Sequence, residues 1–211
     1  MSGSGKSYWS RRLQEAGFTR ICCDDLIEKK LHRELKALSY NGLAGVASWM
    51  GQPFENSYLE RSSRYLECEK EVMLEIVANL NKYSDNDNVV VDTTGSVIYT
   101  GSVILHSLQE LTKVIYLEFP LYTEKEALRL YFKDPKPIIW GNMFHRKKDE
   151  TNNQALRRCY PLLMSFRNKQ YKRLADFSIN NAFLRDPHFS LKMFVEAILN
   201  FRSKLNLLRQ K

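Results

Sequence analysis

The chain opens with Ser2-Gly3-Ser4-Gly5-Lys6-Ser7, which matches all but the first glycine of the phosphate-binding motif G-x-x-x-x-G-K-[ST]. In this motif, called a P-loop, backbone N–H groups surround phosphate oxygens, the lysine reaches the β- and γ-phosphates, and the hydroxyl binds Mg²⁺. We therefore predict phosphate contacts from Gly3, Ser4 and Gly5. Lys6 supplies the cation, and Ser7 supplies the metal-binding hydroxyl.

The position of the motif at the start of the sequence has two interpretations. A P-loop follows a buried strand, and its first glycine would lie one residue before Met1, so we expect a chain that lacks its first strand. Alternatively, a Ser/Gly-rich start is a flexible tail. Trp9, Leu13 and Ala16 stand at helical spacing, and Gly17 follows where a helix cap belongs. This pattern favours the P-loop.

Size and composition indicate a single globular domain spanning residues 1–211. The chain is 44% hydrophobic and 27% charged, and no run approaches the ~20 apolar residues of a membrane span. The start lacks the apolar stretch of a signal peptide, so the cytoplasm is the simplest compartment. The net charge of +8 fits anionic partners, which include nucleotides, phosphorylated metabolites and nucleic acids.

Strands alternate with helices along the chain. Short apolar runs predict strands over residues 18–22, 89–91, 114–117 and 177–179. Helical periodicity predicts helices over residues 25–38, 57–80, 102–110, 123–132 and 153–174, with a C-terminal helix over about 189–208. The glycine-rich residues 39–56 are expected to form an irregular insert. This order predicts an α/β fold with a doubly wound parallel sheet, helices on both faces, and ligands at the carboxyl ends of the strands.

Polar side chains follow the first two predicted strands. Asp24 could orient or deprotonate an acceptor hydroxyl during phosphoryl transfer, whereas Asp25 is expected in the first turn of the next helix. Asp92 either holds Mg²⁺ or caps the turn that contains Thr94 and Gly95. Elsewhere, Glu69 lies on the apolar stripe of a long helix. A carboxylate there is either paired or at the rim of a site, because an unpaired buried charge is costly.

Several segments resemble shikimate-kinase-type P-loop kinases, and the similarity covers most of residues 1–180. Beside the P-loop, Ile21-Cys22-Cys23-Asp24-Asp25-Leu26-Ile27-Glu28 resembles the I-D-x-D-x-x-I-E segment of that family. Lys136-Pro137-Ile138-Ile139 is similar to the R-P-L-L of the lid, which would span about 133–152. Arg167-Asn168-Lys169-Gln170-Tyr171 is similar to R-x-P-L-Y.

The resemblance implies a kinase that uses ATP and Mg²⁺. It implies that Asp24, Thr94 and Gly95 bind the acceptor, and that Arg167 grips the acceptor's carboxylate. Arg129 falls at an arginine that packs on adenine in the family, although the alternative is an exposed helix residue. Lys136 of the lid would neutralise charge on the γ-phosphoryl group and help exclude water, and its alternative is a solvated loop lysine.

Three departures from the family pattern limit which functional roles of the family can be assigned to this chain. Cys22 replaces the first aspartate, Lys136 replaces the lid arginine, and Leu66 stands at the arginine of F-R-x-x-E. Arg64, two residues before Leu66, is the candidate to bind the acceptor in place of that arginine. The insert also enlarges the region that covers the acceptor, so we expect a small hydroxylated, anionic acceptor other than shikimate. Two alternatives stay open: a kinase homologue that binds nucleotide without turnover, and a kinase of nucleic-acid ends, which we rank lower.

Overall fold

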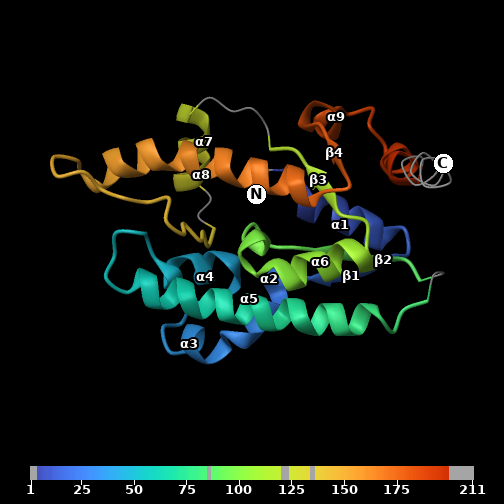
Figure 1. The fold of residues 1–211 in the computed structure, drawn as a ribbon, viewed down its shortest axis with the longest axis horizontal. Helices are drawn as coiled ribbons and strands as arrows, with labels where there is room; N and C mark the ends of the chain where they lie inside the picture. The colour runs from blue at the N-terminus through green and yellow to red at the C-terminus, as the bar shows by residue number, and fades with distance from the viewer. Residues whose placement is uncertain (1–3, 85–86, 120–123, 134–135, 200–211) are drawn as a thin grey trace.

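The structure is a computed structural model, and it describes residues 4–84, 87–119, 124–133 and 136–199. Gly3 of the P-loop therefore lies outside the described residues. Figure 1 shows the arrangement of the elements, which are, in chain order, α1 (Lys6–Glu15), β1 (Thr19–Cys22), α2 (Cys23–Lys30), α3 (His32–Lys36), α4 (Gly42–Met50), α5 (Tyr58–Leu80), β2 (Val89–Asp92), the 3-10 helix η1 (Val97–Tyr99), α6 (Ser102–Leu111), β3 (Ile115–Leu117), α7 (Glu124–Lys133), α8 (Asn152–Leu174), β4 (Phe177–Ile179) and α9 (Asn181–Arg185).

The strands form two parallel pairs rather than one continuous sheet. β1 pairs with β2 from Thr19 opposite Val89 to Cys22 opposite Asp92. β3 pairs with β4 over Ile115–Leu117 and Phe177–Ile179. No hydrogen-bonded pairing joins β2 to β3 within the described parts of the chain. The predicted α/β class with parallel strands is confirmed.

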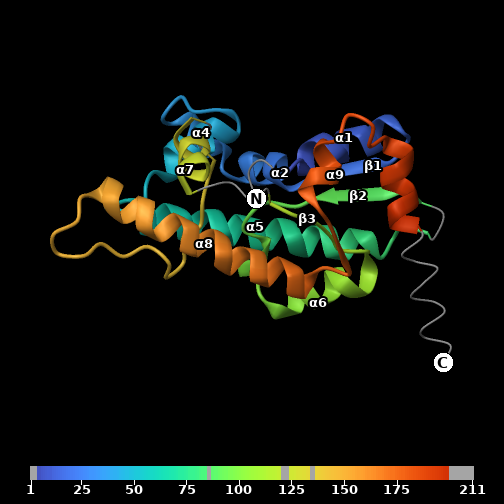
Figure 2. The ribbon, with the colours of Figure 1, turned by 90° about the horizontal axis from the view of Figure 1, so that it is seen from above.

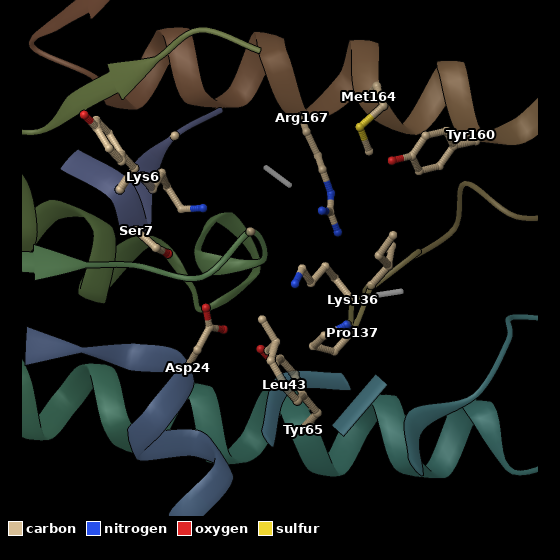
Figure 3. Close-up of a pocket in the computed structure, with 14 residues that line it drawn as sticks. Lys6, Ser7, Asp24, Leu43, Tyr65, Lys136, Pro137, Tyr160, Met164 and Arg167 are labelled. Carbon is tan, nitrogen blue, oxygen red and sulfur yellow. The ribbon is translucent and has the colours of Figure 1, made fainter. Parts of the chain in front are cut away.

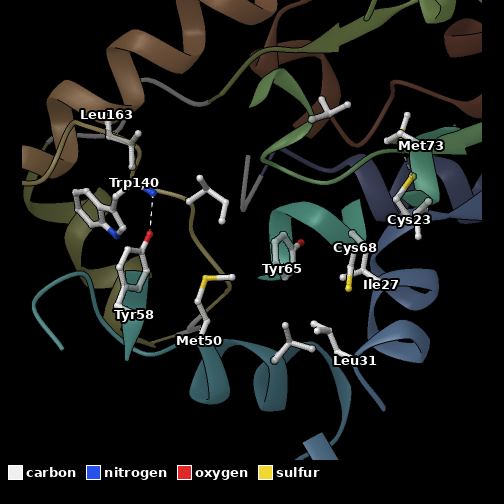
Figure 4. Close-up of a cluster of buried hydrophobic side chains, with 14 of the residues drawn as sticks. Cys23, Ile27, Leu31, Met50, Tyr58, Tyr65, Cys68, Met73, Trp140 and Leu163 are labelled. Atoms are coloured by element: carbon white, nitrogen blue, oxygen red, sulfur yellow. Dashed lines mark hydrogen bonds between the residues drawn. The ribbon is translucent and has the colours of Figure 1, made fainter. Parts of the chain in front are cut away.

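Long helices enclose these strands. α5 and α8, each 23 residues long, run along the long axis of the molecule (Figures 1 and 2). One buried cluster lies among α2, α4, α5 and α8, and Figure 4 shows Tyr65, Met73, Trp140 and Leu163 within it. A second cluster joins α1 to the β3–β4 pair and the C-terminal segment through Trp9, Leu13, Leu117, Ile179, Leu184 and Phe194. Both clusters reach both pairs of strands, because Tyr116 of β3 belongs to the first cluster and Val90 of β2 packs against the second.

The prediction of an irregular insert over 39–56 was wrong, because the segment contains α4. Val46, Trp49 and Met50 are buried in the main cluster, so packing stabilises a helix that its glycines disfavour. Gly51 then takes φ +77, a conformation that suits glycine and ends the helix. The segment therefore contains a regular helix that packs into the core.

Most other element predictions agree with the structure. The predicted helix over 25–38 divides at Leu31 into α2 and α3, whereas those over 57–80, 102–110 and 153–174 are confirmed to within one residue. Residues 191–199 are helical, and the rest of the predicted 189–208 helix lies partly outside the described residues. Within the described chain, no helix has the length and apolar character that a membrane span requires.

Candidate active site

The P-loop residues lead directly into α1. Gly5 adopts φ +87 immediately before the helix, and its carbonyl accepts a hydrogen bond from the Trp9 N–H at 3.0 Å. Trp9 is buried, which fixes the first turn against the second apolar cluster. The N–H groups of this turn and the helix dipole favour an anion in front of Lys6 and Ser7.

A cavity of about 300 Å³ opens in front of this helix start. Segments that are distant in sequence meet around it (Figure 3). Its polar lining consists of the predicted site residues Gly5, Lys6, Ser7, Asp24, Gly95, Lys136 and Arg167. Its apolar and aromatic lining includes Leu43, Tyr65, Pro137, Ile138, Tyr160 and Met164. We call this space the charged cavity.

Asp24 reaches the charged cavity from the first turn of α2. In Figure 3 its carboxylate points toward Ser7 and the interior of the cavity. Burial raises the pKa of Asp24, the positive charge of Lys6 opposes that rise, and the nearby Asp92 adds to it. A carboxyl group with a raised pKa is a stronger base once it is ionised. Asp25 lies in the first turn of α2, as predicted, and it is exposed.

Arg167 descends into the charged cavity from α8 and is 3% exposed. Its Nη2 group donates a hydrogen bond to the Ile139 carbonyl at 2.7 Å, and its guanidinium lies 5.6 Å from the centre of the Tyr99 ring. Its Nε group is buried and has no hydrogen-bond partner among the described residues. The side chain therefore holds the lid segment and retains donor capacity for an anionic ligand.

The lid segment around Lys136 is fastened to α5 by Tyr58. The Tyr58 hydroxyl donates to the Ile138 carbonyl at 2.8 Å and accepts from the Trp140 N–H at 2.9 Å. Burial raises the pKa of Tyr58 to about 12, so the hydroxyl keeps its donor proton at neutral pH. This bond and that of Arg167 fix the backbone two and three residues beyond Lys136. They thereby position its side chain at the cavity.

Glu69 of α5 supports the loop that follows β2. It is fully buried and accepts hydrogen bonds from the hydroxyls of Thr94 and Ser96. Burial raises the pKa of Glu69 to about 7, while these two hydrogen bonds and Arg167 act in the opposite direction. Between the two hydroxyls, the Gly95 carbonyl accepts from the Tyr171 hydroxyl at 2.6 Å. Of the two interpretations of Glu69, pairing is confirmed.

Four predicted ligand-binding residues lie outside the lining of the charged cavity. Ser4 and Thr94 border a neighbouring cavity, and Thr94 is turned toward Glu69. Arg64 forms ion pairs with Glu34 at 3.1 Å and with Glu67 at 3.7 Å. Arg129 is exposed on α7. The structure therefore gives neither arginine a place in this cavity.

Asp92, predicted as a metal ligand, also borders the neighbouring cavity. Its Oδ2 atom accepts from Arg20 and from Ser10, each at 2.8 Å, so it ties β2 to β1 and α1. Its Oδ1 atom is buried and has no hydrogen-bond partner among the described residues. No group of three metal-binding side chains occurs in the described chain. Mg²⁺ in nucleotide sites needs only one or two protein oxygens, because phosphates and water complete its coordination shell. The hydroxyl of Ser7, together with the carboxylate of Asp24 or of Asp92, fits that requirement.

The aromatic and aliphatic residues that line the charged cavity were not predicted from the sequence. Tyr160, Met164 and Arg167 stand at the i, i+4, i+7 spacing of one helix face, so that periodicity could have placed the first two beside the third. Leu43 and Tyr58 carried no comparable signal. Leu43 lay in the segment mistaken for an irregular insert, and Tyr58 acts through its contacts with a loop 80 residues away.

Comparison with known proteins supports the fold. No family model matches the chain. No curated protein matches it in sequence. Among solved structures, it is similar to the shikimate kinase from Acinetobacter baumannii in complex with shikimate, with a TM-score of 0.57 and 19% identity over 94% of this chain and 88% of that one. The protein has a shikimate-kinase-like fold, and the resemblance noted in the sequence is confirmed at that level.

Proposed function

We propose that the protein is a kinase that transfers the γ-phosphate of ATP to a hydroxyl group of a small anionic molecule. The observation that carries this proposal is the convergence of Lys6, Asp24, Lys136 and Arg167 on one cavity at the start of α1. A P-loop alone indicates phosphate binding. A carboxylate and two further cations facing the same space supply the other requirements of phosphoryl transfer.

Each side chain has a distinct part in this proposal. Lys6 and the N–H groups of the P-loop bind the phosphates of ATP, and Lys136 neutralises charge that develops on the transferred group. Asp24 accepts the proton of the acceptor hydroxyl as oxygen attacks phosphorus. Ser7 would hold Mg²⁺, which would supply charge neutralisation at the β- and γ-phosphates, and Asp92, whose buried Oδ1 atom has no partner among the described residues, is the second candidate ligand.

The acceptor is expected to combine an anionic group with an apolar or ring-shaped body. Arg167 provides donors for a carboxylate or phosphate, while Leu43, Tyr65 and Met164 present apolar surface to the same cavity. The hydrogen bond from the Tyr58 hydroxyl to the Ile138 carbonyl holds the lid segment at one side of this cavity. Shikimate remains one candidate to test, and the altered lining predicts that another hydroxylated acid is preferred.

The proposal is tested by measuring ADP formation from ATP and Mg²⁺ across a panel of hydroxylated acids that includes shikimate. At least one acid should stimulate turnover, and Lys6→Ala should lower the stimulated rate by about 10²-fold or more. Lys29→Ala is the matched control, because Lys29 is an exposed lysine of α2. ATP binding without stimulation by any acid would instead support the nucleotide-binding homologue without turnover.

A further inference from the structure

Tyr160 of α8 brings a phenolic hydroxyl to the charged cavity. The residue is 5% exposed, and in Figure 3 its hydroxyl points toward the side of the cavity where Met164 and Arg167 lie. Among the described residues, no group forms a hydrogen bond with this hydroxyl. The donor hydrogen of Tyr160 is therefore available to a ligand in the cavity.

Other aromatic rings hold the Tyr160 ring in place. The ring centres of Tyr131 and Trp140 lie 5.0 Å and 6.0 Å from that of Tyr160, and neither residue lines the charged cavity. Tyr131 is itself fixed by a hydrogen bond from its hydroxyl to Gln52, and Trp140 by the bond from its N–H to Tyr58. These contacts position the hydroxyl before any ligand binds.

One face of α8 carries polar groups at both ends and an apolar side chain between them. Tyr160, Met164 and Arg167 follow the i, i+4, i+7 spacing, and helix geometry places the first and last Cα atoms about 10 Å apart. In Figure 3, Tyr160 lies farther than Arg167 from Lys6. A ligand that extends along α8 thus meets a cation, then apolar surface, then a hydroxyl.

The Tyr160 hydroxyl remains protonated at neutral pH. Burial raises the pKa of Tyr160 from its usual value, and the positive charge of Arg167 only opposes that rise. A ligand that fills the cavity with an apolar group at this point would remove the hydroxyl from water without giving it a partner, which is costly. A ligand oxygen there would accept the hydrogen bond instead. The cavity should therefore discriminate between the two kinds of ligand.

We propose that Tyr160 is a specificity-determining residue, and that the acceptor is an acid with a second hydrogen-bond-accepting oxygen, separated from its anionic group by an apolar stretch. Arg167 binds the anionic group, Tyr160 donates to the second oxygen, and the hydroxyl that is phosphorylated faces Asp24. This inference rests on the proposed function, since it names a further property of the acceptor of that reaction.

The experiment measures binding rather than turnover, with acids that have no hydroxyl group. Calorimetric titration compares 5-oxohexanoate, 6-oxoheptanoate and 7-oxooctanoate with hexanoate, heptanoate and octanoate, so that each pair differs only in one carbonyl oxygen. For at least one pair, the wild type should bind the oxo acid more tightly. Tyr160→Phe keeps the ring and removes the hydroxyl, so it should lower this oxo-acid preference by about tenfold.

Tyr131→Phe is the matched control, because it removes a hydroxyl from the same group of aromatic rings but outside the lining of the cavity. It should leave the preference for the oxo acid unchanged. An equal preference in the wild type and Tyr160→Phe, an equal loss in both variants, or binding of no acid by the wild type would overturn the inference. Failure of the kinase proposal is a different result, the absence of ADP formation with every hydroxylated acid, and it leaves this binding comparison intact.

Discussion

The charged cavity and the neighbouring cavity that Ser4 and Asp92 border meet at the P-loop, and Lys6 lines both. The charged cavity, about 300 Å³ in volume, gathers Asp24, Lys136 and Arg167 from three elements. The neighbouring cavity, about 600 Å³ in volume, is bordered mainly by valine, leucine and aromatic side chains, and residues of β2 and β3 line it. Converging charges are typical of a ligand site, whereas the apolar side chains around the neighbouring cavity belong to the packed interior of the fold. Substitutions should therefore alter rate in the first and stability in the second.

The largest expected effect is on the rate, at Asp24 in the charged cavity. Asp24→Asn removes the base that takes the acceptor proton, so kcat should fall by about 10²- to 10⁴-fold. ATP affinity should be unchanged, because Lys6 and the P-loop backbone are intact. Steady-state ADP formation and calorimetric titration with ATP measure the two quantities.

Asp25→Asn is the matched control for this change, since Asp25 lies in the same helical turn and is exposed. It alters the charge near the α2 N-terminus without altering the cavity. Equal losses of rate in the two variants would mean that the helix dipole, not the position of Asp24, governs the reaction.

The next effect concerns stability at the neighbouring cavity, which Trp9 and Phe194 line. Trp9 is 4% exposed and stacks on Phe194 with ring centres 4.4 Å apart. Trp9→Ala should lower the free energy of unfolding by about 3–5 kcal/mol, the usual cost of removing a large buried aromatic side chain. Phe183→Ala, at a side chain 62% exposed, should cost less than about 0.5 kcal/mol. Urea denaturation distinguishes them, and similar values would show that Trp9 is not packed as described.

The sequence predicted the polar features of the site better than its walls. Short sequence motifs predict the chemical roles of Lys6, Asp24 and Arg167, and all three side chains line the charged cavity. Arg64 shows the limit of that reasoning, because its ion pair with Glu34 depends on the distance between two helices, which no local spacing reveals. The α4 helix was missed for a similar reason: burial of Trp49 and Met50 outweighs the low helix propensity of its glycines.

Glu69 should make stability depend on pH. Burial raises the pKa of Glu69 to about 7, above the value near 4.5 of an unfolded glutamate. The protonated form is therefore favoured by folding, and its stabilising contribution is complete below about pH 4.5 and is lost as pH rises through 7. The loss should approach about 3 kcal/mol, because one pKa unit corresponds to about 1.4 kcal/mol.

Glu69→Gln isolates this contribution, since glutamine can keep hydrogen bonds to Thr94 and Ser96 without titrating. Urea unfolding of both proteins at pH 5 and pH 8 gives the comparison. The stability of the wild type relative to the variant should fall between these pH values. A constant difference would show that Glu69 stays in one protonation state, and the pH dependence would then belong to other groups such as Asp24.

The smallest effect is expected for Lys136→Arg in the charged cavity. A guanidinium binds two phosphate oxygens with a planar pair of N–H groups, whereas an ammonium acts as a point charge. The substitution should therefore raise kcat, by less than about tenfold, and leave Tm unchanged, because Tyr58 and Arg167 hold the lid backbone through main-chain atoms. Lys133→Arg, an exposed position at the end of α7, is the matched control and should change neither quantity. A fall in kcat for Lys136→Arg alone would mean that the cavity has adapted to the smaller cation, which would tie the lysine to an acceptor that needs the additional space.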